Sequence, residues 1–299
     1  MGCVVSINNT DGIPNPPVSD YDFLCVTAKQ KLQKLSHFNT GKSFFYTDRL
    51  KRLWKMRKEP NKEELMSTYH NNFRVFLLPE TNVLLKPTGV FHVKKGIIAI
   101  TMPLAMTDMF EMLHENTNFS CITNGLVQIS NAITWLHQHG LAHRDIKPEN
   151  IAYHQGRFKL IDFDFCSPLE DFTHCGTTHF MCTKEMTYKW NCSAVKASKR
   201  VDIYAFGKTV LVTIWNASRQ KAFAYDKRLL AMFESDYMYD IDVPYPWKNW
   251  FKVALTCCCR EPPDKIPLLP LAITNTVTTS NGVTKITSVK VVHANPVFT

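Results

Sequence analysis

The sequence has few glycines, few cysteines and no long apolar run. Its 11 glycines and 16 prolines show no repeat period, which excludes collagen-like and solenoid architectures. No apolar stretch reaches the roughly 18 residues that a membrane-spanning helix needs. The longest candidate, residues 96–106, is short and contains Pro103. With 45% hydrophobic and 20% charged residues, we expect a soluble globular protein.

Ten cysteines in 299 residues are too few for a disulfide scaffold, and the absence of a C-x-x-C pair argues against a zinc ribbon. The first twenty residues lack the apolar core of a secretory signal, so we expect a reduced, cytoplasmic environment. The chain is about twice as long as the ~150 residues of a typical domain, which indicates two domains or one two-lobed unit.

Acidic residues are outnumbered, with 26 Asp and Glu against 35 Lys and Arg and a formal net charge of +9. The basic residues are dense between Lys42 and Lys62. Such density can serve nucleic acid, acidic substrates or an anionic membrane surface, but its simplest interpretation is a solvated basic face. We expect no nucleic-acid partner.

The amino-terminal residues predict lipidation. Residues 1–6 read M-G-C-V-V-S, which fits the pattern for N-myristoylation at Gly2 once Met1 is removed. A single myristoyl chain binds membranes only marginally, and the neighbouring Cys3 is placed for S-palmitoylation as a second anchor. Residues 1–20 therefore predict a flexible tether, which would hold the protein peripherally on the cytoplasmic face of a membrane.

The middle of the chain predicts a helix, a loop and a hairpin. Apolar residues recur with helical spacing over residues 122–139, which predicts a helix with one buried face. Two short β-like runs, at 151–153 and 158–161, predict a β-hairpin that ends next to Asp162. Between the helix and the hairpin lies the loop formed by residues 140–150.

Polar side chains in this region predict phosphoryl-transfer chemistry. Asp145, Asn150 and Asp162 carry hard oxygen ligands that suit Mg²⁺, which proteins hold with one or two carboxylates and substrate phosphates. Lys147 follows Asp145 by two residues and would neutralise a transferring phosphoryl group. A carboxylate that accepts a hydroxyl proton, metal ligands and a nearby cation together form a phosphoryl-transfer site.

Residues 143–150 read H-R-D-I-K-P-E-N and closely resemble the catalytic loop H-R-D-x-x-x-x-N of eukaryotic protein kinases. Asp162-Phe163 resembles the start of the D-F-G motif of that family. Further along, Gly176-Thr177 resembles the glycine-threonine pair that precedes the substrate-binding loop of the family. The run D-I-Y-A-F-G at 202–207 resembles the D-x-W-S-x-G start of its buried F helix. The resemblance covers roughly residues 30–267.

The resemblance implies an α+β, two-lobed protein-kinase-like fold. Residues 21–104 would form a small β-rich N-lobe and residues 105–270 a mainly helical C-lobe. Residues 271–299 would be a Thr/Val-rich tail, either a loosely docked strand or a disordered segment. The implied cofactors are ATP and Mg²⁺, and the implied partners are proteins that present serine or threonine to a monomeric enzyme.

Carried over position by position, the resemblance makes Asp145 the catalytic base and Lys147 the cation that steadies the γ-phosphate. Asn150 and Asp162 would hold Mg²⁺. A lysine at position 147 is the form found in serine/threonine kinases, whereas tyrosine kinases usually carry A-A-R in this part of the loop. Thr177 would shape the site for the substrate hydroxyl.

The resemblance also implies roles in regulation. Arg144 would pair with a phosphorylated activation segment. The candidate phosphorylation sites in that segment are Ser167, Thr173 and Thr178.

The ATP-binding elements of the small lobe depart further from the family. Among residues 38–45, the best candidate for the glycine-rich loop, only Gly41 matches a family glycine. Lys55 is the best match to the lysine of the V-A-I-K strand. Its glutamate partner on the following helix stays open, because spacing points near Asn71 whereas Glu64 has the right chemistry.

The hinge that would bind adenine is placed by alignment at Met102–Leu104, with Thr101 at the gatekeeper position. Since Pro103 has no N–H group, Leu104 would supply the backbone donor.

Two departures bear on activity. Asp164 replaces the glycine of D-F-G, which should restrict the backbone and add charge beside the metal. C-T-K-E at 182–185 replaces A-P-E. These changes suggest a fast-diverging member of the family, such as the kinases of large DNA viruses. The alternatives to an active serine/threonine kinase are a membrane-associated pseudokinase scaffold and a small-molecule kinase, although the latter usually shows H-G-D in the loop.

Overall fold

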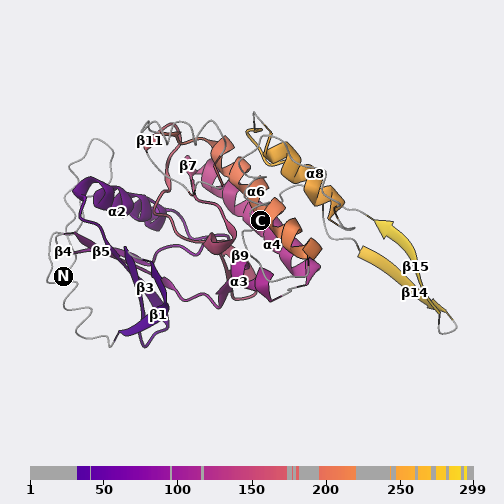
Figure 1. Ribbon diagram of the computed structural model, residues 1–299, viewed down its shortest axis with the longest axis horizontal. Coiled ribbons are helices and arrows are strands. Elements are labelled where there is room, and N and C mark those ends of the chain that lie inside the picture. The colour runs from indigo at the N-terminus through magenta and orange to yellow at the C-terminus, as the bar shows by residue number, and fades with distance from the viewer. Residues whose placement is uncertain are drawn as a thin grey trace. The chain divides into compact units, whose positions relative to one another are not determined.

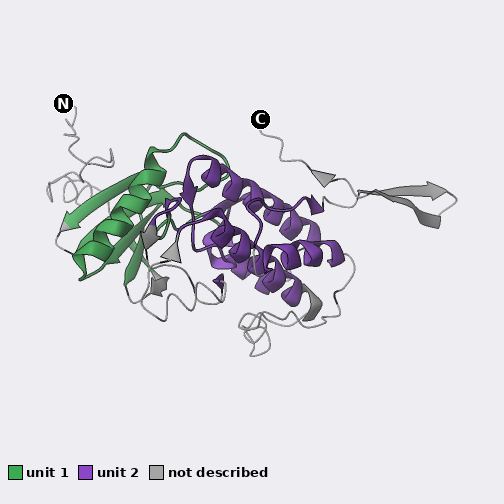
Figure 2. Ribbon diagram, turned by 90° about the horizontal axis from the view of Figure 1, so that it is seen from above, with its two compact units in different colours: residues 1–106, 161–166 green, residues 107–160, 167–299 purple. Residues whose placement is uncertain are grey.

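The computed structural model describes residues 32–40, 42–94, 96–115, 118–173, 177, 180–181, 195–219, 243, 247–259, 262–270, 274–280, 283–290 and 293–294. The chain divides into two compact units (Figure 2). Unit 1 comprises residues 1–106 and 161–166, and unit 2 comprises residues 107–160 and 167–299. Unit 1 is rich in β-strands and unit 2 is mainly helical, which confirms the expected two-lobed fold class. Residues 161–166, which the sequence-based division left in the second lobe, join unit 1.

A five-stranded antiparallel sheet forms the framework of unit 1 (Figure 1). The strand order is β1-β2-β3-β5-β4, so β3 lies at the centre. The strands are β1 (Gln33–Thr40), β2 (Ser43–Thr47), β3 (Arg52–Lys58), β4 (Gly89–Lys94) and β5 (Ile97–Pro103).

One helix, α2 (Lys62–Leu77), packs on this sheet. It begins at Asn61, whose side chain accepts hydrogen bonds from the backbone N–H groups of the first turn and thereby caps the helix. Its apolar residues Leu65 and Tyr69 belong to a buried cluster with alternate residues of the neighbouring strands. The strand residues of this cluster are Val90, Ile98, Ile100 and Met102. The remaining face of the sheet buries a second cluster of Trp54, Val93 and Ala99.

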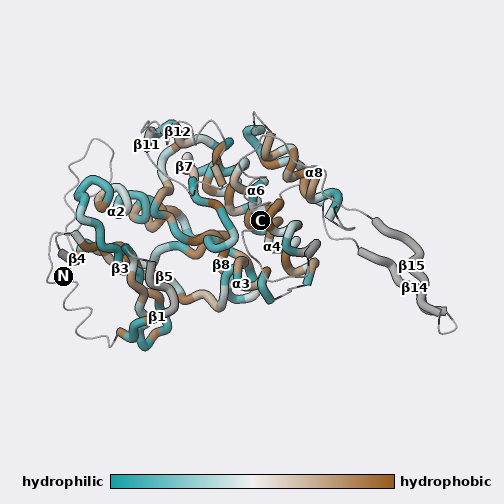
Figure 3. Tube along the Cα trace, viewed as in Figure 1, coloured by the Kyte–Doolittle hydropathy of each residue, from teal (hydrophilic) through white to brown (hydrophobic). Residues whose placement is uncertain are grey.

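Unit 2 contains four described α-helices, which are α3 (Met109–His114), α4 (Phe119–Gln138), α6 (Lys199–Arg219) and α8 (Lys248–Cys257). Helix α4 confirms the helix predicted over 122–139, and hydrophobic and hydrophilic residues alternate along it (Figure 3). The predicted hairpin is confirmed as β8 (Ile151–His154) and β9 (Arg157–Leu160), to which β6 (Thr107–Asp108) adds a third strand. The short pairs are β7 (Leu141–Ala142) with β10 (Ser167–Pro168) and β11 (Phe172–Thr173) with β12 (Val195–Lys196).

Beyond α8, the Thr/Val-rich segment is paired rather than irregular. Strands β14 (Thr274–Ser280) and β15 (Val283–Lys290) form an antiparallel hairpin, and β16 (His293–Ala294) pairs with β13 (Leu269–Pro270). Within the part of the chain that the structure describes, none of the helices combines the length and apolarity needed to cross a bilayer.

Helices α6 and α8 approach each other closely at a glycine. A Cβ atom at Gly207 would lie 2.6 Å from Cβ of Cys257 and 2.6 Å from Sγ of Cys258. It would also lie 3.1 Å from the carbonyl oxygen of Ala254. Position 207 therefore has no room for a side chain. The carbonyl oxygen of Ala254 belongs to the backbone of α8 and the Cβ atom of Cys257 is bonded to it, so neither atom can move away without shifting the helix.

Replacing Gly207 by Ala is expected to lower the free energy of unfolding by about 1–3 kcal/mol, the usual cost of overpacking a core. Urea denaturation followed by circular dichroism measures this loss. Adding Cys258→Ala removes one of the two close contacts and should restore part of the stability. A Gly207→Ala protein as stable as the wild type would mean that the two helices are packed less tightly than described.

Candidate active site

In unit 2, the loop at 143–147 is held by a buried acid from helix α6. Asp202 is fully buried, and its carboxylate accepts hydrogen bonds from the backbone N–H of His143 at 2.8 Å and of Arg144 at 2.7 Å. It also lies 2.8 Å from Nε2 of His137 on helix α4. Arg144 has a left-handed backbone with φ of 68°, so the chain turns sharply just before Asp145. These bonds fix the start of the loop.

Asp145 is surrounded by groups that face its carboxylate. The side chain of Asn150, at the end of the short 3₁₀ helix η1 (Pro148–Asn150), donates to Oδ2 of Asp145 and to its backbone carbonyl, both at 2.8 Å. The hydroxyl of Thr177 donates to Oδ1 at 2.6 Å, and Nζ of Lys147 lies 2.9 Å from Oδ2. Lys147 also donates to the hydroxyl of Thr177 at 2.8 Å. The structure thus brings together Asp145, Lys147, Asn150 and Thr177.

Arg144 lies on the buried side of the same loop. Its guanidinium donates to the hydroxyl of Ser167 at 3.1 Å. Ser167 is 1% exposed, so it is not accessible to a kinase in this conformation. The candidate Thr178 and the side chain of Thr173 lie outside the described residues.

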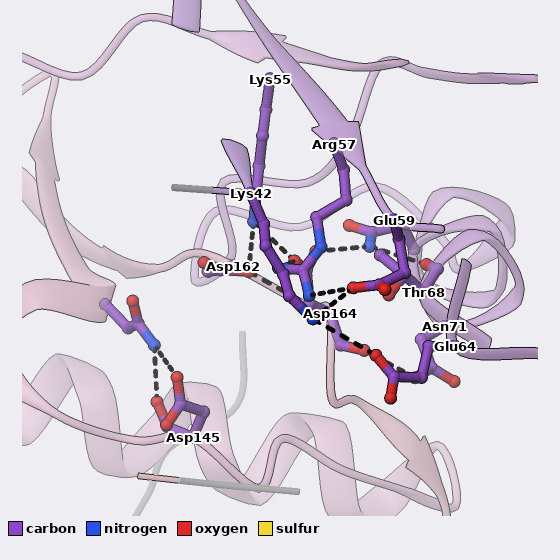
Figure 4. Close-up of polar contacts among 12 residues, drawn as sticks. Lys42, Lys55, Arg57, Glu59, Glu64, Thr68, Asn71, Asp145, Asp162 and Asp164 are labelled. Carbon is purple, nitrogen blue, oxygen red and sulfur yellow. Dashed lines mark hydrogen bonds and ion pairs between the residues drawn. The ribbon is translucent and has the colours of Figure 1, made fainter. Parts of the chain in front are cut away.

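In unit 1, Lys55 occupies the centre of the sheet on β3, where it is 4% exposed. Its Nζ atom donates to Oδ1 of Asp162 and to Oδ2 of Asp164, each at 2.8 Å (Figure 4). Burial alone would lower the pKa of Lys55, but the two carboxylates outweigh it and raise the pKa. Burial and the charge of Asp162 raise the pKa of Asp164, and the cations Lys55 and Arg57 beside it oppose this rise.

The carboxylates that pair with Lys55 do not come from helix α2. Of the two alternatives left open, Glu64 is not the partner, because its side chain is 57% exposed and lies 3.5 Å from Lys42. Asn71 is buried, but it donates to the backbone carbonyl of Asp164. The acid that the sequence analysis treated only as added charge, Asp164, is the partner. Since a buried lysine needs a counter-charge, the unusual acid beside Asp162 was the available signal.

The backbone at Asp164 also differs from our expectation. Replacing a glycine by another residue strains the backbone most where φ is positive. In this segment the residue with a left-handed backbone is Asp162, with φ of 63°. Asp164 is not among the described non-glycine residues with positive φ. The substitution therefore changes charge rather than backbone strain.

The residues assigned to the hinge end strand β5. Thr101 is buried, and its hydroxyl is 3.0 Å from that of Thr88. Met102 is buried in the cluster beneath α2. The N–H of Leu104 donates to the carbonyl of Lys51 at 3.3 Å, so adenine would have to exchange this bond. Gly41, Gly2 and Cys3 lie outside the described residues.

The donor set suits Mg²⁺ and ATP in composition. Among the described residues, no group of three or more His, Cys, Asp or Glu side chains is arranged to hold a metal. Each unit offers single carboxylate or amide oxygens, and Mg²⁺ prefers such donors when phosphate completes its coordination. Because the NH₂ group of Asn150 is turned to Asp145, its amide oxygen is the end available to a metal. Asp162 exposes 35% of its side chain.

Comparison with known proteins gives the family. A family profile described as "Protein kinase domain" matches residues 50–265. Human cyclin-dependent kinase-like 2 is 35% identical over 105 residues, which are 33% of this chain and 20% of that protein. The cAMP-dependent protein kinase catalytic subunit of Dictyostelium discoideum is 28% identical over 152 residues, 49% of this chain and 21% of that protein.

A third relative is MAP kinase-interacting serine/threonine-protein kinase 2 of Xenopus laevis. It is 34% identical over 102 residues, 29% of this chain and 22% of that protein. The aligned segments thus span only 20% to 22% of the length of these relatives.

Proposed function

The chain belongs to the protein kinase family, and on that premise we propose that it transfers the γ-phosphoryl group of Mg-ATP to serine or threonine hydroxyls of proteins. The observation that carries this proposal is the carboxylate of Asp145, with Lys147 at 2.9 Å and the Thr177 hydroxyl at 2.6 Å. A base, a cation and a hydroxyl-bearing side chain are thereby held at one point of unit 2.

The residues of the chain divide the work of the transfer. Asp145 accepts the proton of the substrate hydroxyl as its oxygen bonds to the γ-phosphorus and ADP leaves. Lys147 neutralises charge on the transferred group, and by the family resemblance Asn150 and Asp162 are the residues that would hold Mg²⁺. Mg-ATP, when bound, supplies the phosphoryl group and the metal charge that stabilises the leaving diphosphate. By the same resemblance, Lys55 would contact the nucleotide phosphates, Gly41 would belong to the loop that covers them, and Met102 and Leu104 would contact adenine.

Selectivity for serine and threonine is supported by the contact between Lys147 and Thr177. The lysine donates to the threonine hydroxyl at 2.8 Å. Two residues that the family resemblance connects with hydroxyl substrates are thus in direct contact. The MAP kinase-interacting relative also carries "serine/threonine-protein kinase" in its name. We further propose that the enzyme acts as a monomer.

The test is phosphate transfer from labelled Mg-ATP to the protein itself and to generic acceptors, followed by identification of the labelled amino acid. Label on serine or threonine that disappears in Asp145→Asn is the expected result. Label confined to tyrosine would overturn the proposed specificity. A folded wild-type protein that transfers no more phosphate than Asp145→Asn would overturn the proposed activity.

A pseudokinase is the second candidate function. Close approach of the backbone to phosphate needs residues without a Cβ atom. Residues 38–45 keep only one glycine of the family's phosphate-binding loop, which favours a protein that does not transfer phosphate. A pseudokinase would be a folded wild-type protein that transfers no more phosphate than the Asp145→Asn variant. The same assay measures this difference.

We also propose that acyl chains at Gly2 and Cys3 tether the kinase to the cytoplasmic face of a membrane. The support is the M-G-C-V-V-S start, in which an unhindered amine at Gly2 and a thiol at Cys3 stand side by side. Two acyl chains give stable binding where one gives only reversible contact.

Replacing Gly2 by Ala is expected to abolish myristoylation and to move the protein from the membrane fraction to the soluble fraction of expressing cells. Cys3→Ser should leave myristate in place and weaken membrane binding by an intermediate amount, since one chain remains. Mass spectrometry and cell fractionation measure both effects. Membrane binding that persists in Gly2→Ala would contradict the tether.

A further inference from the structure

Lys55 is a buried cation whose partner decides where its ammonium group lies. An unpaired ammonium in a protein interior is strongly unfavourable, so its side chain follows the nearest carboxylate. Two carboxylates meet it, those of Asp162 and Asp164. In the family that this chain resembles, a glutamate of the helix after β3 would have been expected in this place.

The buried face of helix α2 supplies no such acid. The two glutamates of the helix, Glu63 and Glu64, lie in its first turn and are exposed. Farther along, the buried polar residues are Thr68, Asn71 and Asn72, which are uncharged. The helix therefore presents amide donors, not a carboxylate, to the part of unit 1 that contains Lys55.

Asp164 is surrounded by donors. Its side chain is 5% exposed. Oδ2 accepts from Lys55 at 2.8 Å and from Nη1 of Arg57 at 3.3 Å, and Oδ1 accepts from Nδ2 of Asn72 at 3.0 Å. The backbone carbonyl of Asp164 accepts from Asn71 at 2.8 Å. Figure 4 shows Lys55 and Arg57 converging on this carboxylate.

We propose that Asp164 is the positioning residue for Lys55, in place of a helix glutamate, and that Asn72 of α2 secures it. This inference rests on the proposed kinase function. The counter-charge of Lys55 thus comes from the segment after β9, and helix α2 supplies an amide that binds this acid.

Asp162 and Asp164 have different roles in this arrangement. Asp164 is buried and fully engaged with nitrogen donors, so it is not a metal ligand. Asp162 exposes 35% of its side chain and is the acid that a metal can reach. Without Asp164, Lys55 would pair with Asp162 alone and would compete with the metal for that carboxylate.

A double-mutant cycle tests the proposal with wild type, Asp164→Ala, Asn72→Glu and the double variant. Asp164→Ala is expected to weaken Mg-ATP binding and to lower kcat/KM by between about 10- and 100-fold, as losing a supporting residue behind a ligand does. Asn72→Glu alone should also impair both, because it buries a second carboxylate against Asp164. The double variant should recover most of the loss, since the new glutamate meets Lys55 from the helix. The same substitution at position 72 is thus harmful in one background and beneficial in the other.

Nucleotide affinity is measured by calorimetry and thermal unfolding by circular dichroism, neither of which requires phosphate transfer. A wild type that binds nucleotide without transferring phosphate would defeat the proposed function, yet the binding cycle would still test the role of Asp164. Asp164→Asn keeps the side-chain volume and should show the same loss if Asp164→Ala fails to fold. Glu64→Gln, on the exposed first turn, is the matched control and should bind as the wild type does.

Two outcomes would overturn the proposal. One is an Asp164→Ala protein with wild-type affinity and kcat/KM. The other is an Asn72→Glu substitution that is equally harmful with and without Asp164, because a carboxylate on the helix would then be unable to serve Lys55.

Discussion

Replacing Asp145 by Asn is expected to lower kcat by at least about a hundredfold while leaving the protein folded, because the amide cannot accept the substrate proton. The substitution removes the charge and keeps the shape of the side chain. An amide oxygen can still accept from Asn150 and Lys147, and the hydroxyl of Thr177 can rotate to accept from the new NH₂ group. The loss therefore belongs to the chemical step.

The measurement is the steady-state rate of phosphate transfer at saturating Mg-ATP, together with the midpoint of thermal unfolding. A hundredfold loss corresponds to about 2.7 kcal/mol of transition-state stabilisation. Thr177→Val provides the comparison, because it removes the donor to Asp145 but leaves the base and should cost less. An Asp145→Asn enzyme that keeps wild-type kcat would show that another group accepts the proton.

The central part of the site could be predicted from the sequence because its residues lie close together along the chain. Asp145, Lys147 and Asn150 lie within one loop, whose residue order alone specifies the chemistry. The flanking helix and hairpin follow from local periodicity, and both are confirmed as α4 and the β8–β9 pair. Short-range patterns predict such elements well, since the contacts that form them are local.

The partner of Lys55 could not be predicted in the same way. The pair Lys55–Asp164 joins residues 109 positions apart. Spacing alone points near Asn71 as the partner of this lysine, and charge alone points to Glu64. Only the packing of β3, α2 and residues 161–166 in one unit shows which acid meets the lysine. The burial of Ser167, which removes it from the accessible phosphorylation sites, likewise depends on tertiary structure.

Asp202 gives the largest expected effect on stability. Its carboxylate satisfies the backbone N–H groups of His143 and Arg144 and pairs with His137, all in the interior of unit 2. Asp202→Ala leaves these donors buried without their acceptor, and breaking a buried pair of this kind costs about 3–5 kcal/mol. Urea denaturation at pH 7 measures the change. We also expect lower kinase activity, because the same N–H groups hold the loop that carries Asp145.

The pH dependence of this loss follows from the pKa of Asp202. Burial alone would raise that pKa, but hydrogen bonding and charge from His137, with help from His143 and Arg144, outweigh burial and hold it below the ordinary value of 3.8. A carboxyl whose pKa is lowered by folding contributes stability above its unfolded pKa and loses it as the pH falls through the folded pKa. The difference in unfolding free energy between wild type and Asp202→Ala should therefore be largest at neutral pH and shrink below pH 3.8.

The matched control for this prediction is Asp264→Asn. The pKa of Asp264 is also lowered, first by its hydrogen bond with Arg200, but that pair lies at the surface, where solvent screens it. We expect Asp264→Asn to leave the unfolding free energy nearly unchanged at every pH. If Asp202→Ala were as stable as this control at pH 7, the buried carboxylate would not be what fixes the catalytic loop. The loop would then have to be held by its own backbone contacts, and the link between stability and activity would be lost.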